Sequence, residues 1–255
     1  MPTPDHNALP PLPGLFVTGT DTGVGKTWVA AAIAHCLSQA GRRVGVLKPV
    51  ATGAARQGND LRSDDAELLI EAIGSVVAHD RVAPLVFEEP LAPPVAARLH
   101  GTPLGHAEVL RALGEALAWW AERAEVMVVE GVGGLLCPLA EGKTVADLAI
   151  ALDYPLVIVA RSGLGTLNHM LLTVEAARLR GLRIAGIILN AVGPAADLLV
   201  EETNREELAR RLDRIALLAS LVQVPDPWAL SIVLQSVDWY GWARPPRVGV
   251  QQSPG

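Results

Sequence analysis

Five short segments of this chain consist almost entirely of apolar residues, and stretches with helical periodicity separate them. The segments are 15–18, 44–47, 126–129, 156–160 and 184–189. Strands that helices cover on both faces have such near-continuous apolar runs, whereas strands with one exposed face alternate. Between the runs, apolar residues recur at helical spacing within 29–37, 109–120 and 145–152. This order predicts an α/β fold: a single domain with a doubly wound, mainly parallel sheet.

The two ends of the chain differ in composition from its middle. Residues 1–14 contain five prolines, which predicts a disordered leader. Residues 15–224 carry the strand and helix pattern and form the predicted domain. Residues 225–255 hold three of the six tryptophans without a clear period. We assign that segment no structure and no role from the sequence.

The composition narrows the classes of partner. Hydrophobic residues make up 50% of the chain and charged residues 19%, which excludes disorder throughout. The net charge is −6 and no basic run stands out, so we expect no nucleic-acid partner. The most apolar segment, 148–160, contains Asp153 and Pro155 and is too short to cross a bilayer. Without a signal-peptide pattern, we expect a cytoplasmic protein with no membrane partner. Cys36 and Cys137 lack paired spacing, which favours two small buried residues over a disulfide or zinc site.

A glycine-rich loop, residues 19–27, follows the first apolar run and precedes a helix. Its small residues allow consecutive backbone N–H groups to face one anion. Lys26 would reach the outer phosphates, and the hydroxyl of Thr27 would hold magnesium. The spacing is one residue longer than the usual phosphate-loop pattern, and an ordinary glycine-rich turn is the alternative. The Gly-Lys-Thr ending favours a nucleoside triphosphate site and a sheet of the P-loop nucleoside triphosphatase type.

Two charged residues follow apolar runs where ligands of open α/β sheets bind. Lys48 comes directly after 44–47, and a lysine there could neutralise a phosphoryl group during transfer, although a solvated lysine is the alternative. Glu130 comes directly after 126–129. A carboxylate at the end of a buried strand is costly without a cationic partner, and nucleoside triphosphatases use an acid there around magnesium. A simple tight turn would not require Glu130.

Two further candidates keep structural alternatives. Asp64 and Glu67 have the spacing of a helix-capping pair, which leaves Asp65 as a possible magnesium ligand. Asn190 ends the last apolar run, where its amide could pair with an adenine edge or could terminate a turn. The segment 163–169 leads into a helix and offers a second anion site at its N-terminus. No nucleophile motif for covalent acyl chemistry is present.

Taken together, four motifs resemble the dethiobiotin synthetase family: residues 18–27, 48–53, 129–134 and 165–169, in that order. The longer phosphate loop is normal for that family. The resemblance implies conversion of diaminopelargonate, carbon dioxide and ATP into dethiobiotin, ADP and phosphate, the penultimate step of biotin synthesis. It implies a carbamate of the diamine that attacks the γ-phosphate, with Mg²⁺ as cofactor. It also implies a homodimer with sites at the interface.

The resemblance assigns a role to each matching position. Catalytic residues would be Lys26 and Lys48, and magnesium would be held by Thr27, Asp65 and Glu130. The nucleotide would be bound by those three residues, Thr22, Gly23, Val24, Gly25, Lys26, Gly131, Val132 and Gly133, with Asn190, Pro225, Asp226 and Pro227 at the base. The diamine would meet Thr52, and Gly165, Leu167 and Asn168 of the neighbouring subunit. The chain departs from the family at Ala191, where an acid is common.

Two other activities share this fold. Ligases of the cobyrinate synthase group carry a further glutamine-hydrolysing domain, for which we find no room in 255 residues. Partitioning ATPases switch partners or membranes and usually have a second lysine in the phosphate loop. Here that loop contains only Lys26, and Arg244 and Arg247 are too few for a membrane anchor.

Overall fold

The computed structural model describes residues 9–192, 197–212 and 215–244. Its centre is a six-stranded sheet in the order β12-β11-β10-β1-β7-β2, and every neighbouring pair is parallel. The strands are β1 (Gly14–Gly19), β2 (Val44–Leu47), β7 (Val126–Gly134), β10 (Leu156–Arg161), β11 (Ile184–Asn190) and β12 (Leu217–Leu221). The five predicted strands and the parallel α/β architecture are therefore confirmed.

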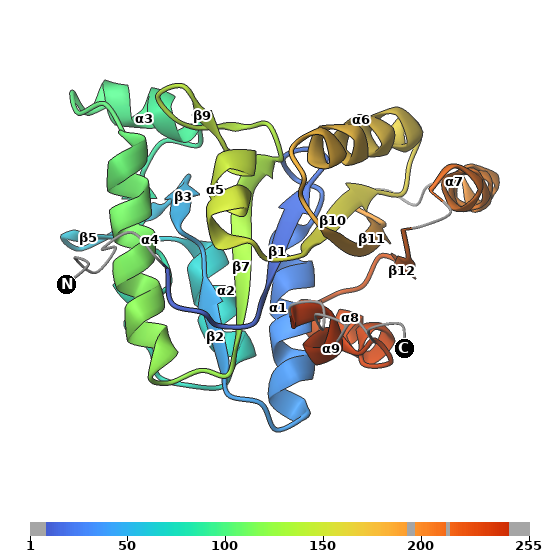
Figure 1. The fold of residues 1–255 in the computed structure, drawn as a ribbon, viewed down its shortest axis with the longest axis horizontal. Coiled ribbons are helices and arrows are strands. Elements are labelled where there is room, and N and C mark those ends of the chain that lie inside the picture. The colour runs from blue at the N-terminus through green and yellow to red at the C-terminus, as the bar shows by residue number, and fades with distance from the viewer. Residues whose placement is uncertain (1–8, 193–196, 213–214, 245–255) are drawn as a thin grey trace, which may run out of the picture.

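Helices cover both faces of this sheet. The helices are α1 (Lys26–Gln39), α2 (Asp64–Ala72), α3 (Pro93–Leu99), α4 (His106–Ala121), α5 (Val145–Leu152), α6 (Thr166–Leu179), α7 (Leu198–Arg211), α8 (Pro227–Leu234), α9 (Trp239–Ala243) and the 3-10 turn η1 (His79–Arg81). In Figure 1, α4, α5 and α6 lie on the near side of the sheet, and α1 and α2 lie behind it. No helix of the described residues is long and apolar enough to cross a membrane.

Three small ladders border the main sheet. They are β3 (Val50–Thr52) with β6 (Leu85–Phe87), the hairpin of β4 (Ala55–Gln57) and β5 (Asp60–Arg62), and β8 (Pro138–Ala140) with β9 (Lys143–Thr144). The β3–β6 pair is parallel, and the other two pairs are antiparallel.

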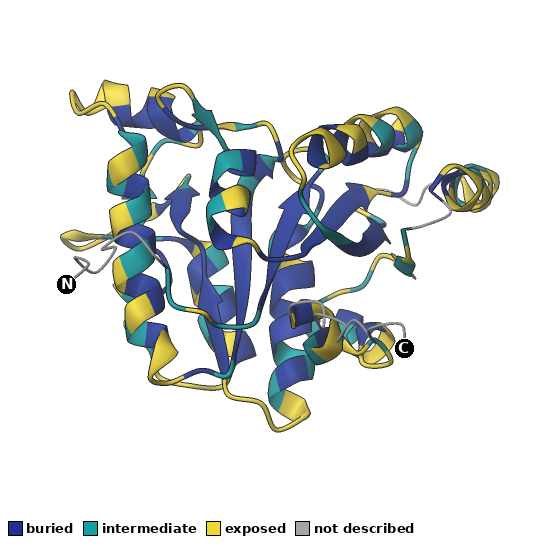
Figure 2. Cartoon of the chain, in the orientation of Figure 1, coloured by how far each residue is buried: buried dark blue, intermediate teal, exposed yellow. Residues whose placement is uncertain are grey.

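The burial of the strands explains why the sequence pattern predicted them. All six residues of β1 and all four of β2 are buried, as Figure 2 shows for the centre of the sheet. Phe16 and Ile158 are among the largest side chains that are fully buried. Each face of these strands is covered, so neither face needs polar residues, and alternation is lost.

Four details differ from the sequence expectations. Strand β7 does not end at Val129 but continues to Gly134. The edge strand β12 has no counterpart among the predicted strands. The N-cap of α2 is Ser63, whose hydroxyl accepts from the N–H of Ala66, so Asp64 is not the capping residue. Both cysteines are half-buried rather than fully buried.

The two ends of the chain lie partly outside the described residues. Of the predicted leader, residues 1–8 are outside, whereas Leu9 and Leu12 pack against the core and Gly14 begins β1. Of the unassigned end, residues 245–255 are outside. The preceding part forms α8 and α9, and α8 packs along α1. Leu234 and Trp239 are buried there, which accounts for part of the apolar composition.

Candidate active site

The phosphate loop connects β1 to α1 and takes a shape that requires glycine. Gly23 and Gly25 have φ of 71° and 86°, the left-handed region that side chains disfavour. A Cβ on Gly25 would lie 2.1 Å from the side-chain nitrogen of Asn190, so the position is closed sterically as well. Gly25 is also the N-cap of α1 and provides no side-chain cap. The first backbone N–H groups of α1 therefore remain available to an anion.

Lys26 is held beside this loop in a buried position. Its side chain curls back so that Nζ donates to the carbonyl of Asp21 over 2.9 Å. Only 6% of the residue is exposed. Burial lowers the pKa of Lys26, and the carboxylates of Glu130 and Asp65 oppose that shift only in part. A desolvated ammonium in this place favours contact with a phosphate, which would replace the lost hydration.

A second lysine lies between two carboxylates at the ends of strands. Nζ of Lys48 is 2.6 Å from Oε1 of Glu130 and 2.7 Å from Oδ2 of Asp65. Strands β2 and β7 pair with Leu47 opposite Val129. Lys48 and Glu130, the residues that directly follow this pair, therefore lie beside each other. Asp65 reaches them from the first turn of α2. The lysine and glutamate are buried, and the aspartate is partly exposed.

The ionisation of this cluster follows from its charges. Burial by itself lowers the pKa of Lys48, but the charges of Glu130 and Asp65 outweigh it, and the pKa is raised. Burial by itself raises the pKa of Asp65, but Lys48 beside it outweighs that effect, and the pKa is lowered. Lys48 is therefore charged and Asp65 is ionised at neutral pH.

The oxygen atoms around Thr27 fit a magnesium ion. Its hydroxyl oxygen lies 2.8 Å from Oδ1 of Asp65 and 3.0 Å from Oε1 of Glu130, and its one proton is donated to one of them at a time. The other oxygen of Glu130 is buried and has no hydrogen-bond partner among the described residues. Two carboxylates and a hydroxyl are hard ligands, and Mg²⁺ binds such sets together with substrate phosphates and water. The described residues contain no cluster of three or more His, Cys, Asp or Glu.

One cavity of about 420 Å³ joins the phosphate loop to this cluster. Eleven residues that the sequence singled out line it: Thr22, Gly23, Gly25, Lys26, Thr27, Lys48, Thr52, Asp65, Glu130, Val132 and Gly133. Asp64, to which the sequence gave only a capping role, lines it as well, and so do Trp28 and Leu68, which the sequence did not single out. Trp28 directly follows the Gly-Lys-Thr ending in the first turn of α1, and that position was the available signal. Gly131 is not part of this lining, but its carbonyl is 3.4 Å from Nζ of Lys48.

A second cavity, of about 230 Å³, lies beside the phosphate loop at the end of β11. Asn190 and Trp28 line it together with the segment 222–224 and Ala191 and Val192. Asn190 is buried, and its amide nitrogen donates to the carbonyl of Val24 over 3.0 Å. A carbonyl only accepts, so this contact fixes the orientation of the amide. Asn190 thus ties the second cavity to the backbone of the phosphate loop.

Comparison with known proteins supplies the family. A family model described as an AAA domain matches residues 13–227. The ATP-dependent dethiobiotin synthetase of Anaeromyxobacter dehalogenans (strain 2CP-C) is 48% identical over 79% of this chain and 86% of its own length. Those of Bacillus licheniformis and Bacillus subtilis (strain 168) are each 42% identical over 77% of this chain and 80% and 82% of their own lengths. The chain belongs to the dethiobiotin synthetase family.

Three positions that the family resemblance assigned to the base lie outside both cavities. They are Pro225, Asp226 and Pro227, at the start of α8. Asp226 is the N-cap of α8 and accepts from the N–H of Ala229 over 3.0 Å. The residues just before them, 222–224, line the second cavity instead. For this member of the dethiobiotin synthetase family, the assignment of 225–227 to the base stays a prediction.

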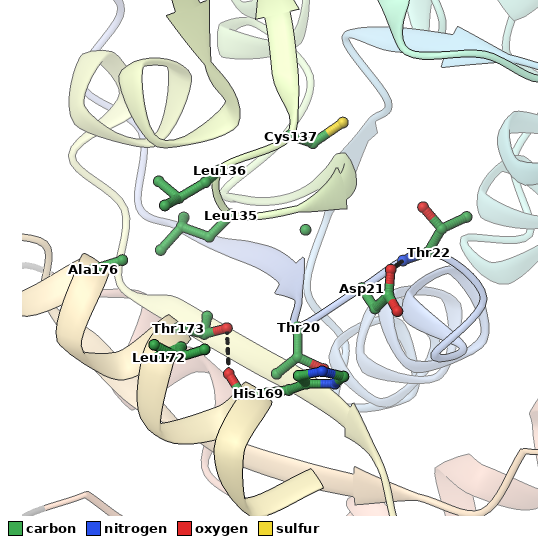
Figure 3. Close-up of a pocket in the computed structure, with 11 residues that line it drawn as sticks. Thr20, Asp21, Thr22, Leu135, Leu136, Cys137, His169, Leu172, Thr173 and Ala176 are labelled. Carbon is green, nitrogen blue, oxygen red and sulfur yellow. Dashed lines mark hydrogen bonds between the residues drawn. The ribbon is translucent and has the colours of Figure 1, made fainter. Parts of the chain in front are cut away.

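The N-terminus of α6 also lies outside the phosphate cavity of its own chain. Gly165, Leu167 and Asn168 line neither of the two cavities, and Gly165 and Asn168 are exposed. A third cavity, of about 350 Å³, separates α6 from the start of the phosphate loop (Figure 3). There His169 and Thr173 of α6 face Thr20, Asp21, Thr22 and the segment 134–137. The dethiobiotin synthetase resemblance assigned these three positions to the site of a neighbouring subunit. Gly165 and Asn168 are exposed, whereas Leu167 is half-buried against the core.

Proposed function

We propose that this protein is an ATP-dependent dethiobiotin synthetase, which closes the ureido ring of dethiobiotin from diaminopelargonate and carbon dioxide with release of ADP and phosphate. Membership of the family and the catalytic arrangement support this proposal. The observation that carries it is the cluster of Lys48, Asp65 and Glu130 around Thr27, in one cavity with the phosphate loop. A simple phosphate-binding turn would not need a buried lysine between two carboxylates.

The reaction requires positioning and charge neutralisation and no enzyme nucleophile. One amine of the diamine takes up carbon dioxide as a carbamate and gives up a proton. A carbamate oxygen attacks the γ-phosphorus, and the bond to the bridging oxygen of ADP breaks. The second amine attacks the carbonyl of the resulting carbamic-phosphoric anhydride, loses a proton, and expels phosphate as the ring closes. Two carbonyl–nitrogen bonds hold the carbon of carbon dioxide in the product.

The residues of this chain divide that work by their places in the cavity. The N–H groups at the start of α1 bind phosphate oxygens, and Lys26 neutralises charge beside the loop. Lys48, at the end of β2, neutralises negative charge on the carbamate and on the phosphoryl group that is being transferred to it. Thr52, which lines the same cavity, contacts the diamine. Mg²⁺, held by Thr27, Asp65 and Glu130, would neutralise charge on the phosphate oxygens. Asn190 lies where it can contact the base.

We further propose a cytoplasmic homodimer in which Gly165, Leu167 and Asn168 complete the site of the neighbouring subunit. Exposed apolar residues on and near α5 and α6 support a second copy of this chain as the partner. Exposed apolar side chains occur on α5, on α6 with the loop before it, and after β7: Ile150, Leu164, Leu172 and Leu136, with exposed fractions of 49%, 89%, 60% and 49%. Burial of such side chains stabilises an interface.

Phosphate release from Mg-ATP and bicarbonate, with and without diaminopelargonate, tests the proposal when the product is followed by mass. We expect diamine-dependent release and a product with the mass of dethiobiotin. Lys48→Ala should abolish most of it, whereas Lys143→Ala should not, because Lys143 is a partly exposed lysine that pairs with Asp147. Phosphate release that is indifferent to the diamine would refute the synthetase and favour an ATPase switch.

A further inference from the structure

A short turn outside the cavity touches the backbone of both elements that carry the cluster. The turn is η1, residues His79–Arg81, followed by Val82. Nε2 of His79 lies 3.0 Å from the backbone nitrogen of Ser63, two residues before Asp65. The carbonyl of Val82 accepts from the backbone N–H of Lys48 over 2.8 Å. One turn therefore contacts the start of α2 and the end of β2, which present Asp65 and Lys48.

The contact between His79 and Ser63 replaces a missing capping group. In a capping box, a Glu or Gln at the third helical position accepts from the backbone N–H of the N-cap residue. Helix α2 has Ala66 at that position, which cannot accept. The ring of His79 accepts instead, and since a backbone N–H only donates, Nε2 carries no proton and Nδ1 carries it. His79 and Ser63 are buried, at 7% and 4% exposure, so water does not readily take over this role.

The turn is itself fixed to the rest of the molecule. The indole nitrogen of Trp120, on α4, donates to the carbonyl of Arg81 over 3.1 Å. The carbonyl of His79 accepts from the N–H groups of Val82 and Ala83. Val82 and Trp120 are buried. A rigid support behind metal ligands usually contributes to metal affinity, because the ligands must keep their positions without the ion.

We propose that His79 is a positioning residue for magnesium: its ring fixes the N-terminus of α2 and thereby holds the carboxylate of Asp65 beside Thr27 and Lys48. The inference rests on the proposed role of Asp65 toward Mg²⁺. It does not depend on which acceptor the phosphoryl group reaches. His79 itself lines neither the cavity at the phosphate loop nor the second cavity, beside Asn190.

The test is binding of ATP by calorimetry, with and without Mg²⁺, to the full chain and its variants. His79→Leu removes the acceptor, and we expect the Mg²⁺-dependent gain in ATP affinity to fall about tenfold or more. Affinity for metal-free ATP should stay within about twofold, because no residue of η1 lines the cavity at the phosphate loop. His79→Gln keeps an acceptor at the reach of Nε2 and should restore most of the gain. His100→Leu, which removes an exposed histidine, is the matched control and should change nothing.

A second pair of variants guards against a folding defect of His79→Leu. His79→Asn has the same amide as His79→Gln on a shorter stem, so only the longer side chain reaches Ser63. Near-ultraviolet circular dichroism should show both folded, with the Mg²⁺-dependent gain weaker in the Asn variant. An equal gain in all His79 variants would overturn the inference, and so would an equal loss with and without Mg²⁺.

The failure of this inference can be told apart from the failure of the proposed function. Wild-type binding that ignores Mg²⁺ would overturn the metal assignment of Asp65 and this inference with it. Phosphate release that ignores the diamine would refute the synthetase while leaving the role of His79 toward Mg²⁺ intact.

Discussion

Replacing Lys48 by methionine removes the ammonium that separates Glu130 from Asp65 and keeps a side chain of similar length. The side chain of Glu130 is fully buried and its contact with Lys48 is 2.6 Å. Removing one partner of a buried ion pair costs about 3–5 kcal/mol, because the other charge stays buried without compensation. Asp65 is partly exposed and can regain water. We therefore expect the metal-free variant to lose about 3 kcal/mol of unfolding free energy, most of it through Glu130.

A second substitution separates the buried charge from simple loss of packing. In Lys48→Met with Glu130→Gln the buried group is neutral and still accepts from Thr27. Most of the lost free energy should return, and a double-mutant cycle should give a coupling of about 2 kcal/mol or more. Equilibrium urea unfolding without nucleotide or Mg²⁺ measures all four proteins. A loss below about 1 kcal/mol in the single variant, or no recovery in the double variant, would refute this reasoning.

The same variant has a definite pH dependence. Burial raises the pKa of Glu130, and without Lys48 nothing as close opposes that shift. A carboxyl group whose pKa is higher in the folded than in the unfolded state binds a proton on folding, so stability falls as pH rises above the unfolded pKa. The destabilisation of Lys48→Met should therefore be smaller at pH 5 than at pH 8.

Turnover of Lys48→Met should fall by about 10²–10³, with nucleotide affinity within about tenfold, if Lys48 acts on the phosphoryl group during transfer.

Three further outcomes are expected. Mixing inactive Lys26→Ala and Asn168→Ala chains should restore part of the activity through mixed dimers, and no recovery after verified subunit exchange would count against a shared site. Gly25→Ala should lower nucleotide affinity at least tenfold in calorimetry, because φ is 86° and the new Cβ would meet Asn190. Asp147→Asn should cost about 1 kcal/mol at pH 7 in urea unfolding, since Asp147 accepts from the N–H of Thr144 at the start of α5. Burial by itself would raise the pKa of Asp147, but its hydrogen bonds with Thr144 and Lys143 outweigh that effect and lower the pKa to about 2. The contribution of Asp147 to the unfolding free energy should therefore vanish as pH falls from about 4 toward 2.

The sequence predicted the strands whose physical environment is uniform. Burial on both faces made β1, β2, β10 and β11 continuous apolar runs, and the structure confirms each of them. The edge strand β12 is different, because its residues are mostly half-buried and include Ala219 and Ser220. With one side unpaired, β12 needs neither continuous apolar residues nor alternation. Its pairing with β11 is a tertiary effect that no local pattern carries.

The structure of the C-terminal segment could not be predicted from the sequence for a related reason. Helices α8 and α9 are short, and their apolar residues are set by contact with α1 rather than by a period of their own. Half-buried Tyr240, for example, has the guanidinium of Arg42 3.9 Å from its ring centre. Arg42 lies just after α1, 198 residues before Tyr240 in the sequence. Such a contact leaves no mark on the residues nearby.

The active site was predictable residue by residue but not as a cluster. Lys48 and Glu130 were each recognised as charges at strand ends, since ligands bind at that edge of the sheet. Their contact depends on β7 lying between β1 and β2, although β2 follows β1 in the chain. Only that insertion sets Leu47 opposite Val129 and brings the next residues together. Asp65 was ambiguous for the opposite reason: acids in a first helical turn stabilise the helix whatever they face. In this chain Ser63 performs the capping, which leaves the carboxylate of Asp65 free to contact Lys48 and Thr27.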